Sequence, residues 1–97
     1  MHREQLDQNK GMLFIYNESK ISKFWMKNTL IPLDIIWIDG NSKIIHIEKN
    51  VQPCITEICK TYGPDIKNKY VLEINAGLID KYNFLTNNNI KISIRNI

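Results

Sequence analysis

Residues Phe24 to Asp39 read FWMKNTLIPLDIIWID, and they hold both tryptophans and the longest dense apolar run of the 97-residue chain. From Leu33 to Ile38 every residue is apolar except Asp34. A strand that is apolar on both faces is usually central in its sheet and covered on both sides. Pro32 cannot donate to a strand ladder, so it marks the strand's start. The stretch therefore predicts a buried central strand that follows a short polar connection, Lys27–Ile31.

Working outward, the upstream sequence predicts a hairpin. Met12–Tyr16 is a short run of strand formers after Gly11, and 17–20 has the composition of a turn. Ile21–Lys27 follows as a second strand, with Phe24 and Met26 on one face and Trp25 and Lys27 on the other. We expect these two strands to pair with each other.

Downstream of the central strand, Asp39-Gly40-Asn41 is a strong hairpin signal. Its partner strand, Lys43–Glu48, should place Ile45 and Ile47 on one face, with Ile44, His46 and Glu48 on the other. The proline- and cysteine-bearing segment 50–69 is interpreted as a long loop. A strand over Lys69–Ile74, a helix from Ala76 to about Leu85 with Asn75 as its N-cap, and a final strand over 90–95 complete the pattern.

These elements predict a mostly β domain, a compact antiparallel barrel-like or folded sheet of about six strands with one short helix near the C-terminus. Residues 1–97 are expected to form a single domain. The apolar fraction of 43%, the charged fraction of 24% and the net charge of +3 are those of an ordinary globular protein. Basic residues are scattered among acids, so nucleic acid is not expected as a partner. No segment reaches transmembrane length.

Several motifs follow one another in the order typical of a known family: Gly11-Met12-Leu13-Phe14, FWMKNT at 24–29, IPLDII at 31–36, Pro53-Cys54, Cys59, Tyr62 and YVLEINAG at 70–77. Over nearly its whole length the chain resembles domain-of-unknown-function family 192 (DUF 192). The resemblance implies a small β-rich domain, often exported or envelope-associated in bacteria and archaea. It implies no established activity.

The resemblance also suggests that the chain starts late. Family members usually carry a further strand upstream, ending in a Leu-Met-x-Arg stretch with which Met1-His2-Arg3 aligns. The strand at Gly11–Tyr16 would then have an exposed edge that invites a homodimer. As it stands, the N-terminus lacks the apolar core of a signal peptide and predicts a cytoplasmic protein. An upstream signal peptide lost with the missing strand would make it exported or periplasmic.

Lys27, Asn28, Thr29 and Asp34 form the candidate polar site, because they flank one proline-marked connection between buried strands. Asp34 is a candidate general base or ligand anchor. The favoured alternative is a structural acceptor for backbone N–H groups of the connection, since buried polar groups are usually satisfied. Lys27 and Asn28 fit an anionic or sugar-like ligand as well as an ordinary turn.

Trp25 lies between cations and fits stacking on a base or sugar, although a core position is preferred. Trp37 is assigned to the core, and His46 is interpreted as a structural histidine. Cys54 and Cys59 are not spaced as a zinc motif, so no metal and no cofactor is expected. In an oxidising compartment they would form a disulfide worth about 2 kcal/mol, and in a reducing one they would be free thiols.

Three functions remain open from the sequence. The first is a small binding or accessory domain for a small-molecule or protein partner, without catalysis. The second is a hydrolase-like enzyme in which Asp34 is the base and Lys27 or Asn28 stabilises negative charge. The third is a structural domain that pairs through an exposed strand edge.

Overall fold

The computed structural model describes residues 11–27 and 29–92. Four of the strands form one antiparallel sheet in the order β1-β6-β3-β4, and β2 and β5 form a second, two-stranded antiparallel sheet. The described elements are β1 (Gly11–Lys20), β2 (Phe24–Trp25), β3 (Leu33–Ile38), β4 (Ile44–Val51), β5 (Thr61–Tyr62), β6 (Asn68–Asn75) and α1 (Leu78–Tyr82). The mostly β fold with one short helix is therefore confirmed. The larger sheet is folded and is not closed into a barrel, since β1 and β4 each have one strand neighbour within the described residues.

The central strand is the one that its sequence predicts. All six residues of β3 are buried, and it pairs with β6 on one side and β4 on the other. Because side chains alternate along a strand, Leu33, Ile35 and Trp37 enter one core cluster, whereas Ile36 and Ile38 enter a second. Trp37 is fully buried, as predicted, and its Nε1–H donates to the carbonyl oxygen of Ser22 at 3.1 Å.

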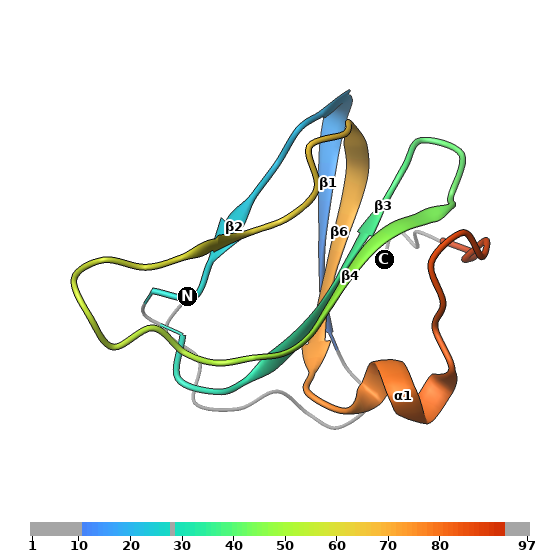
Figure 1. Cartoon of the computed structure of the whole chain (residues 1–97). Coiled ribbons are helices and arrows are strands. Elements are labelled where there is room, and N and C mark those ends of the chain that lie inside the picture. The colour runs from blue at the N-terminus through green and yellow to red at the C-terminus, as the bar shows by residue number, and fades with distance from the viewer. Residues whose placement is uncertain (1–10, 28, 93–97) are drawn as a thin grey trace, which may run out of the picture.

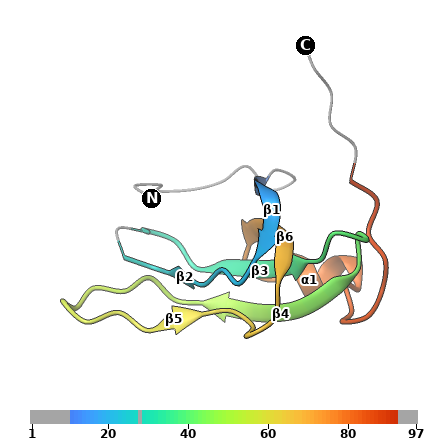
Figure 2. The ribbon, with the colours of Figure 1, turned by 90° about the horizontal axis from the view of Figure 1, so that it is seen from above.

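Each face of the four-stranded sheet has its own cover (Figure 1). On one face lies the small sheet β2–β5, with Met26, Phe24 and Tyr62 in the first core cluster. On the opposite face lies α1, with Leu78 and Ile79 buried in the second cluster. The view from above shows the same order of layers (Figure 2).

The predicted pairing of the first two strands is wrong. β1 pairs with β6, in a register that matches Gly11 with Ile74 and Ile15 with Tyr70. β2 is reduced to two residues and pairs with β5, which lies inside the segment predicted to be an unstructured loop. The predicted turn at 17–20 is a continuation of β1, with a register shift after Ile15. Pairing with distant strands has overridden the local turn composition.

The face assignment in β4 is also wrong, because the strand contains a β-bulge. Trp37 pairs with His46 while Ile38 pairs with Ile44, so Ile45 is an extra residue on β4. As a result Ile45 packs against the first core cluster, and Ile47 packs against the second. The His46 ring lies edge-on to Trp37, with ring centroids 5.2 Å apart. A bulge reverses the alternation beyond it, which the period-two pattern does not reveal.

The C-terminal elements are shorter than predicted. α1 spans five residues, and its N-cap is Gly77 in the left-handed conformation (φ 98°) rather than Asn75. Residues 90–92 are not in a strand, although Asn89 forms an isolated bridge with Lys43. The rest of the predicted final strand, 93–95, lies outside the described residues.

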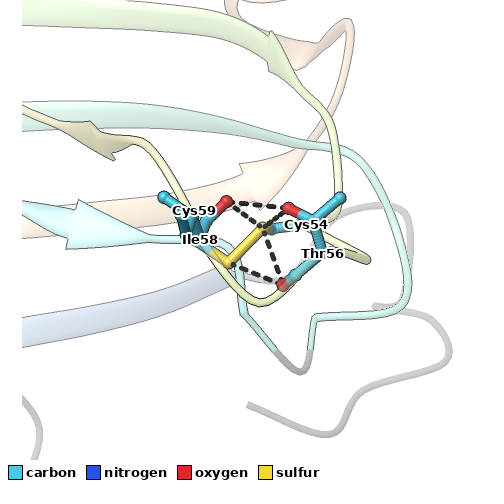
Figure 3. Close-up of a disulfide and its surroundings, with 4 residues drawn as sticks. All are labelled: Cys54, Thr56, Ile58 and Cys59. Carbon is cyan, nitrogen blue, oxygen red and sulfur yellow. Dashed lines mark hydrogen bonds between the residues drawn. A yellow bond between two sulfur atoms is a disulfide. The ribbon is translucent and has the colours of Figure 1, made fainter.

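Cys54 and Cys59 form a disulfide, with their Cα atoms 5.8 Å apart (Figure 3). The bond closes the loop between β4 and β5. The loop is tied to β2 as well, because the backbone N–H of Cys54 donates to the carbonyl oxygen of Met26 at 3.0 Å. The disulfide alternative of the sequence analysis is therefore confirmed.

Replacing both cysteines by serine should lower the free energy of unfolding by about 2 kcal/mol, because a short loop is no longer closed in the unfolded chain. Urea denaturation of the oxidised protein and of the Cys54→Ser/Cys59→Ser variant measures the difference. Reductant should shift the midpoint of the wild type and leave that of the variant unchanged. Equal midpoints for the two oxidised proteins would contradict a stabilising role.

Candidate functional site

A cavity of about 430 Å³ lies on the side of the large sheet that β2 and β5 cover, and we call it the aromatic pocket. Its volume is within the range of about 300–1,000 Å³ that is usual for small-molecule sites. The alternation of β1 turns two aromatic side chains toward this side while Leu13 and Ile15 are exposed. The pocket is lined by Phe14, Tyr16, Lys23, Phe24, Trp25, Lys27 and Thr61.

Edge-to-face ring contacts connect the wall of the pocket to the core. The ring centroids of Phe14 and Phe24 are 5.0 Å apart, and those of Phe24 and Trp37 are 6.3 Å apart. Contacts of this kind add about 0.5–1.5 kcal/mol each beyond the buried area. Because Trp37 is fixed within β3, the apolar wall of the pocket is held rigidly.

Two lysines place positive charge at the pocket. Lys27 Nζ lies 5.4 Å from the centroid of the Trp25 ring, and it has no carboxylate partner among the residues that the structure describes. Lys23 Nζ lies 2.8 Å from Asp65 Oδ1. The hydrogen bond from Lys23, together with its charge, lowers the pKa of Asp65 below its ordinary value. Asp65 therefore pairs with Lys23, whereas Lys27 has no such partner among the described residues.

A glycine brings β5 close to the start of β2. Gly63 has φ 143°, and a Cβ atom at this position would lie 2.8 Å from the carbonyl oxygen of Ser22. A larger residue would push the 61–63 segment away from Lys23, and with it Thr61 on the pocket wall. The width of the pocket thus depends on a close backbone approach that glycine permits.

Asp34 lies elsewhere, on the α1 side of β3, and is 1% exposed. Its Oδ1 accepts the backbone N–H of Asn50 at 2.8 Å, and its Oδ2 accepts those of Gly77 at 2.9 Å and Ile79 at 3.0 Å. Charge-assisted hydrogen bonds of this kind are among the stronger ones in proteins. The carboxylate thus accepts backbone hydrogen bonds, as in the structural alternative, but from donors in other segments than the Lys27–Ile31 connection.

The structure brings together only part of the predicted polar site. Trp25 and Lys27 line the aromatic pocket, whereas Asp34 does not contribute to it and faces the opposite layer. Trp25 is 54% exposed, so the preferred core position for it is wrong. Thr29 is buried, and its Oγ1 has no hydrogen-bond partner among the described residues. Asn28 lies outside the described residues.

Five lining residues, from three separate segments, were not predicted as site residues: Phe14, Tyr16, Lys23, Phe24 and Thr61. The alternation of Phe14 and Tyr16 signals a shared face, but their approach to β2 depends on pairings that no local pattern contains. His46 has the structural setting that was predicted for it. Its Nε2 lies 2.7 Å from Glu48 Oε2, and both side chains are partly buried.

A family profile matches residues 1–92, and its description is DUF192, Uncharacterized ACR. The chain belongs to the DUF192 family. The function of this family is not established. The match confirms the resemblance that the motifs indicate. Among curated proteins, none matches this DUF192 chain.

Two solved structures resemble this DUF192 chain along most of its length. A protein of unknown function from Novosphingobium aromaticivorans has 30% sequence identity and a TM-score of 0.84, and the match covers 95% of this chain and 64% of that protein. A protein from Sinorhizobium meliloti, described as a candidate transcription regulator, has 32% identity and a TM-score of 0.80 over 92% of this chain and 67% of its own. The chain thus spans about two-thirds of the length of these relatives.

The described part of the DUF192 chain has neither a membrane-spanning helix nor a cluster of metal ligands. No helix there is long and apolar enough to cross a membrane. No group of three or more His, Cys, Asp or Glu side chains there is arranged to hold a metal ion.

Replacing Asp34 by alanine should lower the free energy of unfolding by about 3 kcal/mol or more, because three buried backbone donors lose their acceptor. Asp34→Asn should have a smaller effect, since one carbonyl oxygen remains. Urea denaturation midpoints measure both. The matched control is Asp80→Ala, because Asp80 is an exposed aspartate whose only described ion pair is with Lys49, and its loss should cost about 0–1 kcal/mol. Similar midpoints for Asp34→Ala and Asp80→Ala would contradict the structural role.

Proposed function

We propose that this DUF192 chain is a binding domain that takes a small anionic ligand, with a ring that can stack on aromatic side chains, in the aromatic pocket. The observation that carries the proposal is the position of Lys27, whose ammonium group lies over the Trp25 ring with no carboxylate partner among the described residues. A flat ring can stack on Trp25 or on the phenylalanines, while its acidic group reaches the ammonium. Aromatic acids have such a flat ring, and acidic sugars present the C–H face of a puckered ring that packs on aromatic side chains in a similar way.

The lining of the pocket supports binding over catalysis. Phe14, Phe24 and Trp25 offer ring faces, and Tyr16 and Thr61 offer hydroxyl groups. Among the described lining residues there is no imidazole, thiol or carboxylate that would act as a base or nucleophile.

The hydrolase alternative requires Asp34 as a base, and its contacts argue against this role. Both carboxylate oxygens accept backbone hydrogen bonds, and the side chain is buried on the opposite face of the sheet from the pocket. A base must reach the proton that it removes, within hydrogen-bond distance or through one water molecule. Asp34 has no such access to a ligand in the aromatic pocket.

The disulfide supports a place of action outside the reducing cytoplasm. Structural disulfides persist in the periplasm, on cell surfaces and in secreted proteins, and they are rare in cytosolic ones. We place the domain in an oxidising compartment of the bacterial envelope. This agrees with what the family resemblance implies.

Titration with benzoate and with glucuronate, each beside its neutral counterpart (benzyl alcohol and glucose), tests the proposal through the fluorescence of Trp25. We expect one of the two anions to change the fluorescence saturably and its neutral counterpart to bind more weakly. Lys27→Met should weaken the anion by about tenfold, because one charge-assisted contact is lost. The matched control is Lys49→Met, since Lys49 pairs with Asp80 and does not line the pocket.

Failure of both anions to bind, or equal binding by the wild type and Lys27→Met, would rule out the proposed ligand class. Comparing benzoate with glucuronate separates an aromatic acid from an acidic sugar. The tryptophan change should also disappear in Trp25→Phe, because Trp37 is buried in the core.

Releasing Lys23 from its ion pair should strengthen binding. In Asp65→Asn the ammonium of Lys23 no longer faces a carboxylate at 2.8 Å, so the pocket gains positive potential. We expect the affinity for the bound anion to rise by about two- to fivefold at low ionic strength, and the gain to fade as salt increases. Fluorescence titration at two ionic strengths measures it. A weaker affinity in Asp65→Asn would show that Asp65 itself contacts the ligand.

A further inference from the structure

Two neighbouring loops present large apolar side chains to solvent at one end of the molecule. Ile55 and Ile58 lie in the disulfide loop and are 95% and 90% exposed. Leu30, 56% exposed, lies in the connection between β2 and β3, and Trp25 precedes this connection. The loops meet through a bridge between Lys27 and Cys54, and Figures 1 and 2 place them at the same end. We call Trp25, Leu30, Ile55 and Ile58 the apolar tip.

The disulfide loop holds its two isoleucines outward in a fixed form. The disulfide closes the loop at its base, and Thr56 Oγ1 donates to the carbonyl oxygen of Ile58 at 2.7 Å (Figure 3). An isoleucine side chain that folded back onto the protein would be stabilised by leaving water, by about 1.5–3 kcal/mol if it became fully buried. Because the loop is closed, the apolar side chains stay exposed and are already ordered for an external surface.

The charges around the tip are mostly positive. Lys60 lies 5.0 Å from the centroid of Tyr62, Lys27 lies over Trp25, and neither forms an ion pair with another described residue. Glu57, between the two isoleucines, is the single acid within the disulfide loop. An approaching surface therefore meets apolar side chains first and, beside them, the ammonium groups of two lysines that form no ion pair within the described part of the chain.

We propose that the apolar tip docks the protein onto an anionic lipid bilayer. The tip combines aliphatic side chains on protruding loops with a tryptophan and is flanked by lysines, which is the composition of interfacial membrane anchors. Protein interfaces, by contrast, are depleted in lysine. Lysines beside the apolar residues gain attraction from anionic headgroups while their stems lie along the interface. This inference does not rest on the ligand of the aromatic pocket.

Flotation of the oxidised, full-length chain with vesicles tests the proposal. Binding is expected to vesicles of phosphatidylcholine mixed with phosphatidylglycerol, and much less to phosphatidylcholine alone. Ile55→Ser/Ile58→Ser should reduce the partition constant by about tenfold or more, since two apolar anchors are lost. Lys60→Gln should reduce it by about fivefold. The matched control is Leu85→Ser, because Leu85 is 61% exposed but follows α1 and is outside the tip, so binding should not change.

Two further measurements separate a bilayer from a protein partner. Glu57→Gln should strengthen binding to the anionic vesicles, because a repelled carboxylate is removed from the tip. Brominated lipids should quench Trp25, and Trp25→Phe should abolish this quenching. Absence of vesicle binding would overturn the proposal, as would binding unaffected by the isoleucine substitutions. Sedimentation that shows a dimer lost in Ile55→Ser/Ile58→Ser would likewise overturn it, and would assign the tip to a second copy of the chain.

Discussion

Three backbone N–H groups converge on the buried carboxylate of Asp34, and two irregular parts of the fold depend on them. Near the end of β4, Leu33 pairs with Val51 and Ile35 with Glu48, so β4 holds one residue more than β3. Asn50, at φ 52°, lies in this bulge, and Asp34 accepts its N–H. The same carboxylate accepts two N–H groups at the start of α1, whose N-cap residue has no side-chain cap. Burying a charge costs several kcal/mol, which these three contacts offset.

The elements that sequence predicts well are those decided by neighbouring residues. The burial of β3 follows from its apolar run, which Asp34 alone interrupts. The turn after Asp39 follows from its polar composition, because Asp39 Oδ1 accepts two backbone N–H groups across it, although the left-handed residue is Ser42 and not Gly40. The disulfide was one of two alternatives left open by two cysteines in a loop, and the structure contains it. Pairing partners could not be predicted in the same way. β1 pairs with β6, about 60 residues away along the chain. A long strand with apolar positions on both faces is stabilised more by pairing with a central strand than with the two-residue β2.

Only part of the candidate site was predicted, because its residues come from segments whose pairing the local sequence does not determine. Trp25 and Lys27 were assigned to one strand face, and the structure places both at the aromatic pocket. Asp34 was grouped with them because it is close in sequence. It lies within β3, however, and strand alternation places it opposite Leu33 and Ile35, in the layer that contains α1. Residues that are close in sequence can therefore face opposite layers when one of them lies in a strand that is covered on both faces.

The layers on the two sides of β3 are fixed by different sets of contacts, and we expect binding in the layer that is fixed less firmly. The α1 side is fixed by Asp34 and by a buried cluster of isoleucines with Leu78. The opposite layer has a ladder of two residue pairs, supported by the disulfide, the Lys23–Asp65 pair and the hydrogen bond from Trp37 to Ser22. Binding elements tend to come from the less stable parts of a fold. Because Phe24 contacts Trp37, a change inside β3 alters the pocket through its apolar wall, whereas a change at Lys27 alters its charge alone. Substitutions at the surface lysines therefore report on recognition, and substitutions in β3 report on the scaffold.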